Sequence, residues 1–218
     1  MNFKFLVLIL FFIGCKQTDN SSVTPPSTGY ILLDYTEGQS YDINYKDVNN
    51  MASKYNVILG DVYLTPIRDQ SFSTSGHIEL ISKEDAHGSS MVAEGLAKKA
   101  LEEGTAKLSS LVSGFNKKYS GTELDHSSIV NPLCDCLKNA RSNDIVFLFS
   151  DILENDFGVN YRRMTPEEIT SHLNSKCKSN TTIIAVVQAF RESDDEYLRA
   201  TIPAYEAAFS NFHYVTNL

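Results

Sequence analysis

The chain contains no tryptophan and no cluster of basic residues. Its 19 Lys and Arg residues are outnumbered by 27 Asp and Glu residues, which gives a formal net charge of -8. Proteins that bind nucleic acid offer concentrated positive charge to its phosphates, so this composition argues against nucleic acid as a partner. Charged residues are thinly spread and aromatic residues are frequent, and we therefore expect most of the 218-residue chain to fold.

Cysteine is scarce as well, and its spacing argues against a zinc site. Cys134 and Cys136 form a Cys-Asp-Cys segment, which is not a zinc spacing, and none of the five histidines stands at a paired metal spacing. In an oxidising compartment a disulfide could join Cys177 to either Cys134 or Cys136, which leaves one thiol over. Three buried free thiols are the alternative.

The amino terminus has the form of a cleaved targeting signal. Lys4 supplies a positive charge, residues 5–13 are apolar but too few to span a bilayer, and a small residue precedes Cys15. The segment Phe-Ile-Gly-Cys resembles the bacterial lipobox, with Phe in place of the usual Leu. This resemblance implies that residues 1–14 are a signal peptide and that Cys15 carries acyl chains such as palmitate, which anchor the protein in a membrane.

The residue after the lipidated position is Lys16 rather than Asp, which in lipoproteins of this type favours the outer membrane of the bacterial cell envelope. An ordinary signal with an incidental cysteine is the alternative. Residues 15–28 are rich in Ser, Thr, Asn and Pro and have no apolar periodicity, which predicts a flexible tether.

The folded domain is expected over residues 29–218. Short apolar strand candidates alternate there with helical segments, and this order predicts an α/β fold with a mainly parallel, doubly wound sheet flanked by helices. The helix expected over residues 89–119 contains three glycines, which weaken it and could break it.

Two of the predicted strands end in residues suited to a hard cation. Residues 145–149 are a continuous apolar run, typical of a strand buried on both faces, and Ser150 and Asp151 follow it. A second run of this form leads into Asp34 and Thr36. Open α/β sheets place ligands at the carboxyl ends of their strands, so we expect these side chains to converge. Their oxygens suit a divalent cation; alternatively, they only cap the helices that follow.

The order of these motifs resembles a von Willebrand factor type A (VWA) domain, of the divergent kind found in many bacterial proteins. In that family the first strand ends in Asp-x-Ser/Thr-x-Ser, a Thr lies before a later helix, and an Asp follows the next central strand. Asp34, Thr36 and Asp151 match three of these positions, and Ser127 falls where the Thr stands. The resemblance implies a metal-ion-dependent adhesion site that holds Mg²⁺ or Mn²⁺.

Binding of a protein partner, rather than catalysis, is the function that this resemblance implies. Thr36 and Ser127 would donate hydroxyl oxygens, Asp34 and Asp151 would ligate directly or through water, and a carboxylate of the partner would take the open position. Gly38 stands where the family has its second hydroxyl, so the alternative is a metal-free structural module of an envelope complex.

A metal-dependent hydrolase is a further alternative, because a metal held by two carboxylates can activate water. No Gly-x-Ser-x-Gly motif is present, and no histidine or lysine stands near either acidic motif. We therefore do not expect an enzyme.

Overall fold

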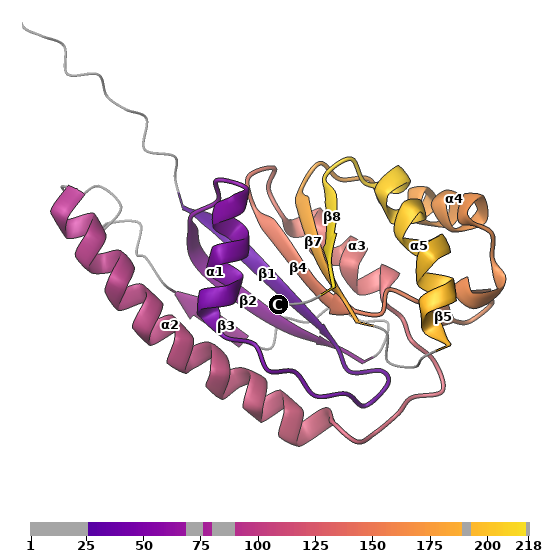
Figure 1. The fold of residues 1–218 in the computed structure, drawn as a ribbon, viewed down its shortest axis with the longest axis horizontal. Coiled ribbons are helices and arrows are strands. Elements are labelled where there is room, and N and C mark those ends of the chain that lie inside the picture. The colour runs from indigo at the N-terminus through magenta and orange to yellow at the C-terminus, as the bar shows by residue number, and fades with distance from the viewer. Residues whose placement is uncertain (1–25, 69–75, 80–89, 189–192, 217–218) are drawn as a thin grey trace, which may run out of the picture.

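The computed structural model describes residues 26–68, 76–79, 90–188 and 193–216. Within these residues, six strands form one sheet in the order β3-β2-β1-β4-β7-β8, and every neighbouring pair is parallel except β2 with β3 (Figure 1). The predicted α/β fold with a mainly parallel sheet is confirmed. The predicted signal peptide, Cys15 and most of the predicted tether lie outside the described residues.

Strands and helices alternate through most of the chain. The strands of the sheet are β1 (Ser27–Asp34), β2 (Leu59–Ile67), β3 (Gly76–Glu79), β4 (Ile145–Ser150), β7 (Thr182–Val187) and β8 (Phe212–Val215). The helices are α1 (Tyr45–Lys54), α2 (Ser90–Tyr119), α3 (Val130–Asn139), α4 (Pro166–Lys176) and α5 (Asp194–Ala208). Between β4 and α4 lie a small hairpin, β5 (Asn155–Asp156) and β6 (Val159–Asn160), and the 3₁₀ turn η2 (Tyr161–Arg163).

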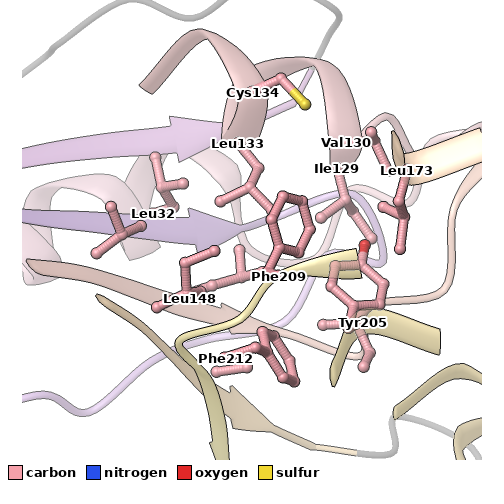
Figure 2. Close-up of a cluster of buried hydrophobic side chains, with 14 of the residues drawn as sticks. Leu32, Ile129, Val130, Leu133, Cys134, Leu148, Leu173, Tyr205, Phe209 and Phe212 are labelled. Carbon is pink, nitrogen blue, oxygen red and sulfur yellow. The ribbon is translucent and has the colours of Figure 1, made fainter. Parts of the chain in front are cut away.

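Helices cover both faces of the sheet and create two apolar cores (Figure 1). One core lies under α1 and α2, and the other lies under α3, α4 and α5. Figure 2 shows the second core, in which Leu32 and Leu148 of the sheet lie near Leu133 of α3 and near Tyr205 and Phe209 from the end of the chain. Full burial of each such side chain contributes about 1.5–3 kcal/mol, so these two cores hold the layers together.

The central strand β4 is buried on both faces, as its apolar run indicated. Val146 and Leu148 belong to the core under α3, α4 and α5, whereas Phe147 and Phe149 belong to the core under α1 and α2. Because neither face meets water, the strand has no polar alternation until it ends at Ser150. This places a polar residue at the carboxyl end of the most buried strand.

The tether was predicted two residues too long, because β1 begins at Ser27 rather than near residue 29. The Ser27 amide donates to the carbonyl of Ile58 at 2.8 Å, and the Thr28 amide donates to the Asp144 carboxylate at 2.9 Å. These acceptors come from distant parts of the chain. They satisfy the backbone of two polar residues that carry no apolar signal of a strand.

The helix α2 is continuous from Ser90 to Tyr119, so its glycines do not break it. Leu108 and Val112 in its second half are buried in the core under α1 and α2. This packing offsets the helix penalty of roughly 1 kcal/mol for each glycine. Neither α2 nor any other helix in the described ranges is long and apolar enough to cross a lipid bilayer.

A disulfide joins Cys134 of α3 to Cys177, the residue that follows α4 as its C-cap, and Cys136 is a buried free thiol. The sequence left open which of the two α3 cysteines pairs. Residues two positions apart on a helix do not share a face, so only one of them is directed at the end of α4. The bond therefore fastens α3 to α4 on one side of the sheet.

Removal of this disulfide is expected to lower the free energy of unfolding by about 4 kcal/mol, because the cysteines are 43 residues apart and the unfolded chain regains the entropy of an open loop. The measurement is urea unfolding of the wild type and of a Cys134→Ser/Cys177→Ser variant, each with and without dithiothreitol. Reductant should destabilise the wild type and leave the double variant unchanged. If dithiothreitol left the free energy of unfolding of the wild type unchanged, the pairing would be contradicted.

Candidate functional site

The candidate site lies at the carboxyl ends of β1 and β4, which are adjacent parallel strands. Asp34 is the last residue of β1 and Ser150 the last residue of β4. The Ser150 hydroxyl donates to Asp34 Oδ2 at 2.7 Å, so the two strand ends are joined directly. The structure therefore brings these two motifs together at one edge of the sheet.

Asp34 is fully buried and accepts hydrogen bonds on both oxygens. Besides the bond from Ser150, its Oδ1 accepts from the Thr36 amide at 3.0 Å and from the Thr36 hydroxyl at 2.6 Å. Burial raises the pKa of Asp34, while the hydrogen bonds from Thr36 and Ser150 oppose that rise. The carboxylate thus orders the loop that follows β1.

Ser127 completes this polar cluster from a third segment. Its Oγ lies 3.0 Å from Thr36 Oγ1, although the two residues are 91 positions apart. The Ser127 backbone exchanges hydrogen bonds of 2.8 and 2.9 Å with Asn155, which fastens the loop before α3 to the hairpin. Three of the four residues predicted as metal ligands, Asp34, Thr36 and Ser127, therefore form one connected cluster.

Asp151, the fourth predicted ligand, lies beside this cluster on the first residue after β4 and is buried. Its Oδ1 accepts from the Leu153 amide at 3.0 Å, and its Oδ2 lies 3.4 Å from Nη2 of Arg162. Burial is the largest cause that raises the pKa of Asp151, the charge of Asp34 raises it further, and Arg162 opposes the rise. The next residue, Ile152, has a φ of 54°, a left-handed conformation that is rare for a β-branched residue.

Two residues of the site were not predicted from the sequence, and both belong to the segment after β4. Arg162 forms ion pairs at this edge, and Glu154 is buried beneath it. Glu154 Oε2 accepts from the amides of Ile129 and Val130 at 2.6 and 2.9 Å. These amides open α3, whose N-cap has no side-chain hydrogen bond of its own, so a distant carboxylate caps the helix. No local motif could have revealed either contact.

The missing hydroxyl at Gly38 has a structural cause. Gly38 adopts a φ of 69°, and a Cβ added there would lie 2.9 Å from the backbone nitrogen of Thr122. A serine would be strained and would also collide with the backbone. The glycine therefore lets the loop that carries Thr36 lie close to the segment before Ser127, and this position has no room for a third hydroxyl ligand.

The oxygens of the cluster fit a hard cation only in part. Mg²⁺ prefers six oxygens in octahedral geometry at about 2.1 Å, and adjacent ligands are then about 3 Å apart, which matches the spacing of the Thr36 and Ser127 hydroxyls. Both Asp34 oxygens, however, are already hydrogen-bonded, and Asp151 faces a guanidinium. Among the described residues, no three His, Cys, Asp or Glu side chains are grouped so as to hold a metal.

A scan of protein-family models and a search of curated proteins found no match to this chain. The fold class and the geometry of the sheet edge are thus the observations on which a functional proposal rests.

Glu154 makes the stability of the domain depend on pH. Burial raises its pKa from the ordinary value of 4.5 to about 7, against the opposing hydrogen bonds from the Val130 and Ile129 amides. The folded-state pKa lies above the unfolded value, so the stabilisation is complete below pH 4.5 and is lost as the pH rises through about 7. The change that this group adds is roughly 3 kcal/mol.

Glu154→Gln removes the titrating group but keeps an oxygen that can accept from the α3 amides. We expect its free energy of unfolding to fall less between pH 4.5 and 8 than that of the wild type, by roughly 3 kcal/mol. The exposed Glu167→Gln on α4 serves as the matched control and should follow the wild type. Parallel curves for wild type and Glu154→Gln would show that the carboxyl has the same pKa in the folded and unfolded chains.

Proposed function

We propose that the chain is a lipid-anchored protein of the bacterial cell envelope, and that its VWA-like domain binds a protein partner at the carboxyl edge of the sheet. The observation that carries the proposal is the meeting of Asp34, Thr36 and Ser127 in one buried hydrogen-bonded cluster at that edge. These segments are far apart in sequence, and their convergence supports a site that the fold constructs.

Binding suits the chemistry of this edge better than turnover. The hydroxyls of the cluster that could act as nucleophiles are those of Thr36 and Ser127. No histidine or lysine among the described residues forms a hydrogen bond with either of them. A hydroxyl without a neighbouring base is a poor nucleophile. The buried carboxylates are held by hydrogen bonds and by Arg162.

The proposal has a metal-dependent and a metal-free form. In the first, Thr36 and Ser127 would hold Mg²⁺ or Mn²⁺ through their hydroxyls, with Asp34 and Asp151 beside it, and the ion would supply a coordination position for a partner's carboxylate. The 3.0 Å spacing of the two hydroxyls favours this form. The ion pair between Arg162 and Asp151 favours the second form, in which the partner meets the edge without a metal.

An exposed aromatic side chain near the site supports contact with a protein. Phe157 lies at the tip of the β5–β6 hairpin and is 83% exposed, which is unusual for so large an apolar side chain. Its ring stands 5.7 Å from that of His126, and the base of the hairpin is bonded to Ser127. Rigidly held aromatic residues are common anchors of protein interfaces.

Partner binding at this edge can be tested with a photo-crosslinking amino acid placed at position 157 in intact cells. Ile58 is the matched control, because it is also exposed, at 59%, but precedes β2 and so lies at the opposite ends of the parallel strands. We expect an adduct of defined mass from position 157 and none from position 58. Adducts of equal yield at both positions, or none at 157, would count against the proposed surface.

The lipid anchor is tested separately. Cys15→Ser should abolish labelling with an alkyne-tagged fatty acid and should move the protein from the membrane fraction to the soluble fraction, because the acyl chains supply the membrane affinity. Lys16→Ala, which leaves the cysteine in place, should keep both the label and the membrane association. Retention of the label in Cys15→Ser would refute lipidation at this residue.

A further inference from the structure

The outer side of strand β8 lies beside a groove. β8 is the last strand of the sheet (Figure 1), and within the described residues no strand pairs with its outer side. A groove of about 720 Å³ lies between β8, the end of β7 and one flank of α5, and this volume is typical of sites that hold a ligand. None of the residues of the Asp34 cluster lines it, so it is a separate feature of the molecule.

The main chain of Tyr214 faces the outer side of β8. The Ile183 amide of β7 donates to the carbonyl of Asn211 at 3.0 Å, which fixes the register of the two strands. In a parallel ladder, alternate residues direct both main-chain groups to the same neighbour, so His213 shares the side of Asn211 and Tyr214 faces the opposite side. The amide and carbonyl of Tyr214 are therefore placed to pair with an added strand.

The side chains beside this main chain form an apolar surface. Tyr214 is aligned with Ala185 of β7, so its ring lies on the face of the sheet that α5 covers, and yet the residue is 44% exposed. Ile202 and Pro203 of α5 line the same groove and are not fully buried. An extended segment beside β8 would direct every second side chain to this face, where it would contact the tyrosine ring and Ile202.

Two unpaired charges on α5 give the groove a charge pattern. Asp195 and Arg199 are exposed, both line the groove, and neither forms an ion pair in the described part of the chain. Four positions on a helix span about 6 Å along its axis, and two positions on a strand span about 6.8 Å. A basic and an acidic side chain two positions apart on a strand can therefore meet both charges. Glu206 adds a second acid two turns further along α5.

We propose that the outer side of β8 and the flank of α5 form a second binding surface, which takes an extended segment of a protein partner as a seventh strand of the sheet. Tyr214 supplies the main-chain pairing. A basic and an acidic side chain of the added strand, two positions apart, meet Asp195 and Arg199, and an apolar side chain lies against Ile202. This surface goes beyond the one that we assign to the Asp34 cluster, so either can fail while the other stands.

The test uses fluorescein-labelled heptapeptides of threonine and valine with blocked termini. One carries Lys two positions before Glu, the second carries them in the opposite order, and the third has Gln at both positions. Binding to the full chain in mild detergent is measured by fluorescence anisotropy. We expect the wild type to bind one charge order about fivefold more tightly than the other. Whichever order that is, Asp195→Lys/Arg199→Glu should prefer the opposite one.

Lys99→Glu/Glu103→Lys is the matched control, because it exchanges an exposed pair at the same spacing on α2 and should keep the wild-type preference. Main-chain pairing is read by amide hydrogen exchange in NMR spectra. Saturating peptide should slow exchange of the Tyr214 amide and leave the His213 amide, which already faces β7, unchanged.

Three results would overturn the proposal: no saturable binding of any peptide, equal affinity of the wild type for the two charge orders, or a Tyr214 amide whose exchange rate the peptide does not change. If the charge-exchange variant of α5 does not fold, Arg199→Gln decides, because it alters one exposed side chain. Loss of the preference between the two charge orders in Arg199→Gln supports the proposed contact, and a preference of unchanged size contradicts it.

Discussion

The buried Asp34 carboxylate is the group on which the arrangement of the sheet edge depends. It ends β1, accepts from Ser150 at the end of β4, and holds the following loop through the amide and hydroxyl of Thr36. Thr36 in turn lies beside Ser127, which is bonded to the hairpin. A carboxylate with this many donors is stable inside a protein only if each donor is placed correctly, so one side chain specifies the positions of three segments.

Two sets of long-range contacts hold the segment between β4 and α4 in place. It supplies Glu154 to the amides of α3 and Arg162 to three carboxylates. Both contacts give a partner to polar or charged groups that would otherwise be buried without one. The hairpin between them leaves Phe157 exposed at its tip, so a firmly held base presents an apolar side chain to solvent.

Much of the site could be anticipated because parallel strands end at a common edge. Asp34 and Thr36 follow one apolar run and Asp151 follows another, and the fold class alone brings such residues together. The contacts of Arg162 could not be anticipated in the same way, since two of its three carboxylate partners, Asp151 and Asp194, lie 11 and 32 residues away, the third is Glu37, and no spacing relates them. In the sequence, Gly38 indicates a lost ligand, whereas its positive φ and the lack of room for a Cβ beside the Thr122 backbone show a constraint of the backbone.

The features that the sequence alone determined are those that depend on interactions between neighbouring residues. The buried strand β4 follows from a continuous apolar run, and the start of α4 follows from a capping box at Thr165, because these patterns concern neighbouring residues. Tertiary structure alone decided that Cys134 rather than Cys136 pairs with Cys177, that β1 begins at Ser27, and that a guanidinium stands against Asp151. Each of these depends on which distant groups the folded chain brings within contact distance, and no local pattern encodes that.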